Sequence, residues 1–101
     1  MRFTDKGVFD MHDTQKAVVT VVGNDHTGII AKVTGVCFDC NANVTDLSQS
    51  VLDGIFCMAL IIDITESNSA IDEIEKKIQN AVPGMTVHVM HEKIFDSMHR
   101  I

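Results

Sequence analysis

Two stretches of the chain carry apolar side chains at nearly every position. Residues 16–22 read KAVVTVV and end at Gly23, and residues 56–64 read FCMALIIDI. Continuous apolar and β-branched runs of this length are typical of strands that are covered on both faces. The pattern therefore predicts two central strands of a sheet.

Two other segments show the spacing of a helix with one apolar face. In residues 28–40 the apolar side chains recur every three or four residues, at Ile29, Ile30, Val33, Val36, Cys37 and Cys40. A second stripe is formed by Ile71, Ile74, Ile78 and Val82 and ends at Pro83 and Gly84. Ser69, with Asp72 three residues later, has the spacing of a capping box. We predict one helix in each segment.

Alternation of apolar and polar side chains predicts two further strands, over residues 44–53 and 85–90. The Asp53-Gly54 pair that follows the first of them is a strong signal for a two-residue hairpin turn. A short closing helix is predicted over residues 92–98, with Ile94, Phe95 and Met98 as its apolar side chains.

These elements follow one another as strand, helix, strand, strand, helix, strand. The order is that of two βαβ-type units joined by a hairpin, the ferredoxin-like βαββαβ sandwich of the α+β class. Right-handed crossovers place the first and third strands in the centre of a four-stranded antiparallel sheet. Two helices are then expected on one face, followed by the short C-terminal helix.

The length of 101 residues suits one domain. With 46% hydrophobic and 22% charged residues, a single core is expected to form without disulfides. Residues 1–15 show no period and are predicted to be a flexible N-terminal arm that can dock through Phe3, Val8 and Phe9. The domain is assigned to residues 16–101.

The formal net charge of −6 argues against nucleic acid as a partner, because the eight basic residues are scattered. The longest apolar stretch, residues 55–62, is too short to span a membrane, and the N-terminus lacks the apolar core of a signal peptide. The three cysteines lie in apolar surroundings, which indicates reduced thiols. A cytoplasmic location without membrane association is therefore expected.

The turn between the first strand and the first helix has the chemistry of an anion-binding site. The first amides of a helix have no partner within the helix and lie at the positive end of its dipole, so they suit a carboxylate. Gly28 lets a ligand approach this backbone, Asp25 can pair with an ammonium group, and Asn43 can orient either group. The same residues also have a structural explanation, because a strand that leads into a helix needs glycine and a capping residue in any case.

The stretch AVVTVVGNDHTGIIAKVTGVCFDCNANVTDLSQSVLDGIFCMAL resembles an ACT domain. Its most specific part, GNDHTGIIAKV, is similar to the Asp-x-x-Gly-Ile/Leu-x-Ala-x-Val turn and helix of that family, and Asn43-Val44 follows at the start of the second strand. The similarity covers residues 16–98. It is strongest with small stand-alone bacterial ACT proteins and with the ACT portions of glycine-cleavage regulators and formyltetrahydrofolate deformylase. Thr27 departs from the family pattern, in which many members carry proline.

The resemblance implies a non-catalytic regulatory module that binds an amino acid or a related metabolite at a homodimer interface. The ligand would lie between the turn of one subunit and the second edge strand of its neighbour. The implied binding residues are Asn24, Asp25, His26, Thr27, Gly28, Ile29, Ile30, Asn43 and Val44. No cofactor and no metal are expected, and the module would act on a partner enzyme or regulator.

Five residues allow both a chemical and a structural interpretation. Cys37 and Cys40 have the spacing of a metal or redox pair, but they fall late in a helix on its apolar face, which favours core packing. His88 and His91 fall on opposite faces of a strand, a poor geometry for one metal ion. His26 is different, because in the turn it can equally contact a ligand or be simply exposed.

Two alternatives to a ligand sensor stay open. The chain can be a partner-binding or structural ACT module that keeps the fold and has lost the ligand. An enzyme is the weakest hypothesis, because the sequence offers no nucleophile and base at useful spacing and no phosphate-binding glycine loop.

Overall fold

The computed structural model describes residues 14–99, and its elements follow the predicted order. The strands are β1 (Lys16–Asn24), β2 (Asn43–Leu52), β3 (Ile55–Asp63) and β4 (Thr86–His91). The helices are α1 (Ile29–Asp39), α2 (Ile71–Ala81) and α3 (Glu92–His99). The predicted ferredoxin-like fold is confirmed. The arm residues Phe3, Val8 and Phe9 lie outside the described part of the chain.

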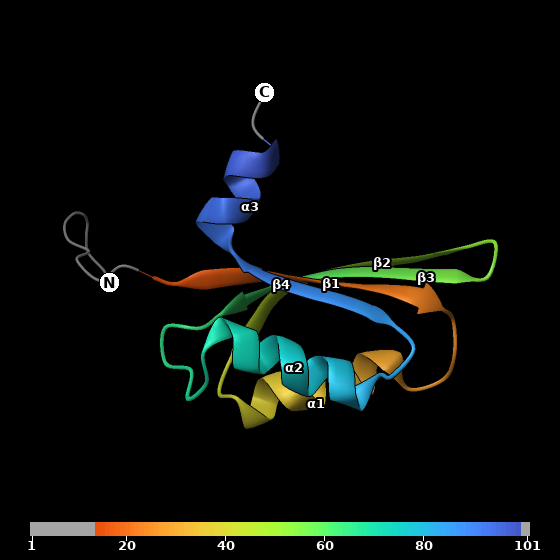
Figure 1. Ribbon diagram of the computed structural model, residues 1–101, viewed down its shortest axis with the longest axis horizontal. Coiled ribbons are helices and arrows are strands. Elements are labelled where there is room, and N and C mark those ends of the chain that lie inside the picture. Colours follow the sequence, from red (N-terminus) through yellow and green to blue (C-terminus); the bar gives the residue numbers. More distant parts are fainter. Residues whose placement is uncertain (1–13, 100–101) are drawn as a thin grey trace.

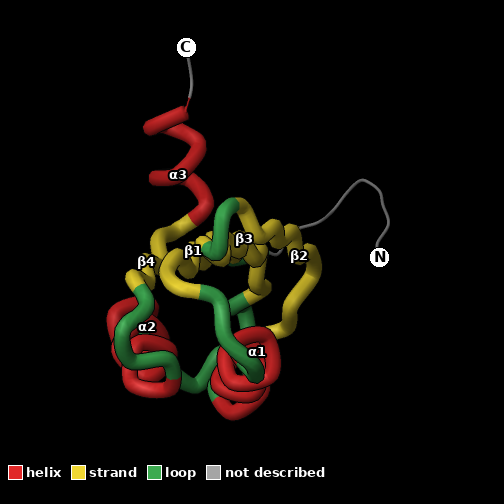
Figure 2. Tube along the Cα trace, turned by 90° about the vertical axis from the view of Figure 1, so that its right-hand side faces the viewer, coloured by secondary structure: helices red, strands yellow, loops and turns green. Residues whose placement is uncertain are grey.

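The four strands form one antiparallel sheet in the order β2-β3-β1-β4, so the apolar strands β1 and β3 are central as predicted. Figure 1 shows α1 and α2 side by side on one face of this sheet, with α3 on the opposite side. Seen end-on in Figure 2, α2 lies below β4 and α1 lies on the β3 and β2 side. The sheet therefore has one face covered by two helices and one face that α3 reaches only at one end.

The hairpin between β2 and β3 fixes the register of the edge strand. Asp53 and Gly54 have φ angles of 54° and 80°, which the short polar side chain and the missing Cβ allow, and Leu52 then pairs with Ile55. Near the start of β2 the register shifts between Val44 and Asp46. The predicted two-residue turn is confirmed.

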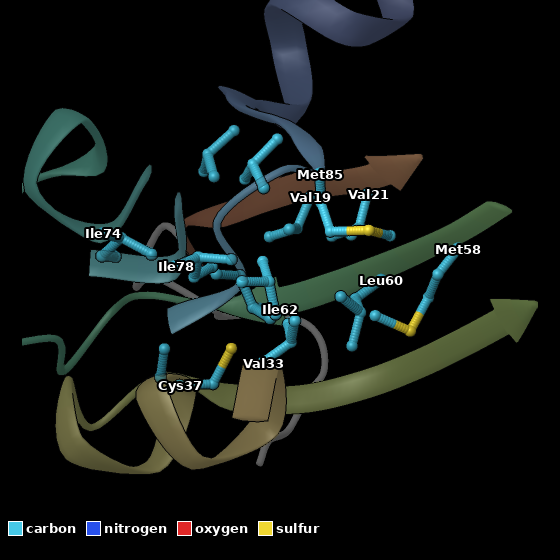
Figure 3. Close-up of a cluster of buried hydrophobic side chains, with 14 of the residues drawn as sticks. Val19, Val21, Val33, Cys37, Met58, Leu60, Ile62, Ile74, Ile78 and Met85 are labelled. Carbon is cyan, nitrogen blue, oxygen red and sulfur yellow. The ribbon is translucent and has the colours of Figure 1, made fainter. Parts of the chain in front are cut away.

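The core fills the space between the sheet and α1 and α2 (Figure 3). Alternate residues of the central strands point towards the helices, and they include Val19, Val21, Leu60 and Ile62, which are fully buried. They meet side chains from both helices, namely Val33 and Cys37 of α1 and Ile74 and Ile78 of α2. Cys37 and Cys40 are free thiols with no exposed surface, so their predicted role in core packing is confirmed.

The start of α2 differs from the prediction by one residue. Ala70, not Ser69, is the N-cap, and its backbone N–H donates to the Glu73 carboxylate at 2.9 Å. Ser69 instead belongs to the preceding turn, where its N–H donates to the Ser67 hydroxyl at 3.0 Å. The predicted pairing of Ser69 with Asp72 is wrong because these local hydrogen bonds already engage the serine.

Helix α3 turns away from the sheet directly after β4, on the side opposite α1 and α2 (Figure 1). Phe95 is half-buried, but Ile94 keeps 56% of its surface exposed. The predicted closing helix is present, but Ile94 does not pack into the core, because only the first part of this helix stays near β1 and β4.

The imidazole of His91 caps α3. Its Nδ1 accepts a hydrogen bond from the backbone N–H of Lys93 at 3.1 Å, so Nε2 carries the proton and donates to Oε1 of Gln15 at 2.7 Å. Gln15 is also tied to the residue that follows β3, because its carbonyl accepts the N–H of Ile64 at 2.8 Å. One side chain thus joins the start of β1, the end of β4 and the start of α3.

We expect His91→Ala to lower the free energy of unfolding by about 1 kcal/mol, because it removes a cap and a partly buried hydrogen bond. Urea denaturation measures the change. His91→Asn is the matched control, since asparagine is a good N-cap but is too short to replace the contact with Gln15. It should recover about half of the loss, and an asparagine variant no more stable than the alanine variant would contradict the capping role.

Candidate ligand-binding site

The turn between β1 and α1 ends in a glycine with a left-handed conformation. Gly28 is the N-cap of α1 with a φ of 91° and a ψ of 3°, which other residues adopt only with strain. Its carbonyl accepts the first helical hydrogen bond from the N–H of Lys32 at 3.0 Å. The glycine is thus needed to start the helix in this direction, and its missing side chain also leaves the approach to the backbone open.

The positive end of α1 is left uncompensated. Within residues 14–99 no side chain caps this helix, and its first turn contains no acidic residue. The amides of Ile29, Ile30 and Ala31 precede the first i to i−4 donor and have no partner inside the helix. A carboxylate placed here would gain both amide hydrogen bonds and the helix dipole.

A surface hollow of about 320 Å³ lies beside this turn. Its lining comes from the turn and α1 with Asp25, His26, Gly28, Ile29, Ile30 and Ala31, from β2 with Gln49 and Val51, and from β3 with Phe56. The backbone N–H of Asp25 donates to the Gly54 carbonyl at 3.0 Å. This bond holds the turn against the β2–β3 hairpin and so fixes the hollow between them.

The predicted side chains of the turn differ in what they can offer a ligand. Asp25 and His26 are exposed, and the Nδ1–H of His26 donates to the Thr27 carbonyl at 3.2 Å, which leaves Nε2 as an acceptor. Ile29 is only 2% exposed, so it can contribute its backbone amide but not its side chain. Asn24 is the last residue of β1 and pairs with Ile55, outside the hollow lining.

The other two predicted residues, Asn43 and Val44, lie at the far end of α1. The helix has 11 residues and therefore separates them from the Gly28 turn by about 16 Å. Val44 is half-buried against the core, and Asn43 lines a different hollow of about 430 Å³. Within one subunit the structure thus brings together the turn residues but not Asn43 and Val44.

The hollow beside Asn43 contains an ionised carboxylate. Hydrogen bonds from Thr65 hold the pKa of Asp63 below its usual value, and the side chain of Thr65 has the largest effect. The backbone N–H of Thr65 also donates to the Asp63 carboxylate at 2.9 Å. Lys16 contributes a smaller attraction in the same direction. Asp63 is therefore held as an anion by its own neighbours, which gives it a structural role at this end of the sheet.

Sequence reasoning missed Gln49, Val51 and Phe56 as parts of the hollow. All three lie on the helix side of the sheet. Gln49 and Val51 are two residues apart on β2, and Phe56 lies directly opposite Val51 on β3. The register set by the Asp53-Gly54 turn fixes which β2 residues point to this side. Only the packing of α1 beneath the sheet, however, decides that they meet the β1–α1 turn.

The alternative chemical centres do not form in the described structure. Among residues 14–99 there is no group of three or more His, Cys, Asp or Glu side chains placed to hold a metal ion. Burial, with a smaller contribution from Cys40, raises the pKa of the Cys37 thiol to about 11, so it is protonated and a poor nucleophile at neutral pH. His88 and His91 pair with Thr20 and Ala17 on opposite faces of the sheet, as predicted.

Comparison with known proteins agrees with this architecture. The family model described as ACT domain matches residues 15–91. UPF0237 proteins of Methanopyrus kandleri and Clostridium perfringens are 38% and 42% identical, and the alignments cover 85% and 84% of this chain and 98% of each relative. The chain is thus similar to these relatives over nearly their whole length.

Among solved structures, an ACT domain protein from Streptococcus pneumoniae is similar with a TM-score of 0.70 and 27% identity, over 86% of this chain and all of that one. A formyltetrahydrofolate deformylase from Pseudomonas syringae shares the fold, with a TM-score of 0.71 and 18% identity over 78% of this chain and 28% of the enzyme. The fold and the glycine turn define a ferredoxin-like α+β domain with an open helix start. The chain belongs to the ACT domain family.

Proposed function

We propose that this protein is a non-catalytic regulatory module that binds an amino acid or a closely related small metabolite. The observation that carries the proposal is the uncapped start of α1 at Gly28, which opens into a hollow shared with Asp25 and Gln49. The proposal assigns no reaction to this site. Binding would instead change how the protein associates with a partner enzyme or regulator.

The hollow offers a complementary group for each part of an amino acid. The amides of the first turn of α1 suit the carboxylate, and the exposed carboxylate of Asp25 suits the ammonium group. Val51 and the half-buried Ile30 provide apolar surface for a side chain. Gln49 can donate or accept and would orient whichever polar group comes near it.

A homodimer that pairs β2 with β2 of a second copy would complete this site. Strand β2 runs from Asn43 to the hairpin beside the turn, so antiparallel pairing would bring Asn43 of the partner subunit towards the turn of the first. The exposed apolar side chains Leu47 and Val51 along this edge support such a contact. The separation of Asn43 from Gly28 within one chain then follows from a site built by two subunits.

We also propose a cytoplasmic location. Cys37 and Cys40 are buried as free thiols, which suits a reducing compartment. In the part of the chain that the structure describes, no helix is long and apolar enough to cross a membrane.

The proposal predicts a thermal shift in a screen of the common amino acids and related metabolites. A ligand at about 100 times its Kd stabilises the folded state by about 2.7 kcal/mol, which raises the melting temperature of a domain of this size by about 10 °C. Asp25→Asn should weaken binding by about 10-fold or more, because a charge-assisted hydrogen bond is lost.

Asp53→Asn is the matched control for this change. It removes the same charge from an exposed turn residue outside the hollow, and asparagine also tolerates the φ of 54° found there. It should leave the ligand affinity unchanged. A flat screen across all compounds would reject the sensor and leave a partner-binding ACT module, for which affinity capture of the partner is the next measurement.

A further inference from the structure

The sheet face opposite α1 and α2, here called the open face, carries mainly apolar side chains along its two central strands. Its central part consists of Val18, Thr20 and Val22 on β1, Cys57, Ala59 and Ile61 on β3, Ser48 and Ser50 on β2, and His88 and Met90 on β4. The acidic and basic residues of this face, Lys16, Asp46 and Asp63, lie at its margin. In an antiparallel sheet with one face in solvent, the residues that point to that face are normally polar. Strands β1 and β3 instead have the pattern of strands that are covered on both sides.

Helix α3 covers only one end of the open face. Near this helix Val18 is 6% exposed, but towards the hairpin Val22 and Ile55 keep 40% and 39% of their surface exposed. Figures 1 and 2 show α3 rising from the sheet instead of lying along it. The part of the face towards the hairpin therefore has no cover within the described chain.

Helix α3 itself is only partly packed in the single subunit. Its eight residues project about 12 Å from the sheet, and Ile94 on it is 56% exposed. A helix of two turns is not stable in water on its own and needs an apolar partner surface. The same side of the molecule thus presents a partly uncovered sheet and a helix that is packed only at its start.

The middle of the open face is a shallow depression. Ser48, Ala59 and Thr20 lie in one row across the sheet, and these short side chains leave a hollow of about 290 Å³ that extends to Ser50 and Cys57. Larger apolar side chains border it, with Ile61 on the α3 side and Val22 towards the hairpin. This surface can receive a projecting apolar side chain without rearrangement.

We propose that the open face is covered by a second copy of this chain, related by a two-fold axis that places α3 of each subunit beside the uncovered end of the other sheet. Facing sheets pack about 10 Å apart, which matches the height of about 12 Å to which α3 projects. Each Ile94 would then be buried against the partner subunit. Each subunit has a formal net charge of −6. Because the centre of the open face carries no acidic or basic residue, two subunits can meet there without bringing like charges together.

The area supports α3 as part of this contact. The open face measures about 30 by 15 Å, or about 450 Å² per subunit, whereas small specific interfaces bury about 600 Å² per partner. One side of α3 adds about 120 Å². The face alone is therefore too small for a stable interface, and the face together with α3 reaches the lower end of the range.

The test is the mass of the full chain in solution, measured by sedimentation equilibrium. Ala59→Lys puts a charge at the centre of the open face, at an exposed position where the chain can still fold. It should halve the mass, either from dimer to monomer or, where subunits also pair through β2, from tetramer to dimer. Ile94→Asp should have the same effect, although the two residues are not neighbours within one subunit. Asn80→Lys, at an exposed position of α2, is the control and should leave the mass unchanged. An unchanged mass in the folded Ala59→Lys variant would overturn the proposal.

Cys57 provides a second measurement in the unmodified protein. It is the partly exposed thiol on the open face, whereas Cys37 and Cys40 are fully buried and report whether the chain stays folded. Covering by a second copy predicts that the rate of alkylation of Cys57 by iodoacetamide falls about 10-fold or more as the protein concentration rises through the association. An alkylation rate that does not depend on protein concentration would overturn the proposal. If that constant rate is also slow, it would point to residues 1–13 of the same chain as the cover.

This inference does not depend on the proposed ligand. Ala59 lies outside the hollow beside Gly28, so the Ala59→Lys variant should keep any thermal shift that the wild type shows. A flat ligand screen with a halved mass would reject the sensor and support the open-face contact. A thermal shift in the ligand screen with an unchanged mass would support the sensor and reject the open-face contact.

Discussion

Replacing Leu60 with alanine is expected to lower the free energy of unfolding by about 3 kcal/mol, and with it the melting temperature by about 15 °C. Leu60 lies in the middle of β3 and has no exposed surface. Its side chain packs between the sheet and α1 and α2, where Figure 3 shows it among the other core residues. Truncation therefore removes apolar contacts and leaves a cavity that rigid strands on both sides cannot close.

Urea denaturation of Leu60→Ala and of Leu52→Ala separates burial from the loss of a leucine as such. Leu52→Ala is the same substitution at the end of β2, where Leu52 is 76% exposed. It should lower the free energy of unfolding by less than about 0.5 kcal/mol. A loss below about 1 kcal/mol for Leu60→Ala would mean that the core is not packed as described.

The second large effect is a loss of stability in alkaline solution that depends on Cys37. Burial raises the pKa of this thiol from 9.0 to about 11 in the folded state. The folded form therefore holds its proton more tightly than the unfolded chain. The stabilisation is complete below about pH 9 and is lost as the pH rises to about 11, because the unfolded chain then releases a proton that the folded chain keeps. Two pKa units correspond to about 2.7 kcal/mol.

The measurement is the free energy of unfolding in guanidinium chloride between about pH 8 and about pH 11. The sequence contains no tyrosine, so no phenol titrates in this range. Cys57→Ser, at the partly exposed cysteine, should keep the alkaline decline. Cys37→Ala should be less stable at neutral pH because of the cavity, yet its decline above about pH 9 should be smaller. Equal slopes in all three proteins would contradict the role of Cys37.

The secondary structure was predictable because its signals are local. Apolar runs, helical stripes and the Asp53-Gly54 turn each act over a few residues, and the element bounds differ from the prediction by at most two positions. The strand order followed from chain connectivity and the handedness of crossovers. The core role of Cys37 and Cys40 was also predictable, since Cys37 falls on the apolar stripe of α1 and Cys40, its C-cap, continues that spacing.

The ends of the elements were less predictable because several short polar residues compete there. Ser67, Ser69 and Asn68 all offer hydrogen bonds before α2, and the packed turn decides that Ala70 becomes the N-cap. The capping of α3 by His91 had no sequence signal, because imidazole acts as a cap here only through its bond to Gln15, 76 positions away in the chain.

The candidate site divides in the same way. The turn from Asp25 to Gly28 was predictable, because a glycine before an apolar stripe marks the open start of a helix. Gln49 and Val51 joined it only through the packing of α1 beneath β2 and the hydrogen bond from Asp25 to Gly54. Asn43 lies elsewhere in the subunit, since the 11 residues of α1 separate it from the turn.

The sequence by itself determined the kinds and order of the elements, the central strands and the glycine turn, because each depends on side-chain periodicity or on local backbone preference. The tertiary structure decided which side chains share the hollow beside Gly28, that α3 turns away from the sheet, and that Ile94 and Val22 stay exposed. These features depend on contacts between residues far apart in the chain, and a periodic pattern shows that a face is apolar without showing what covers it.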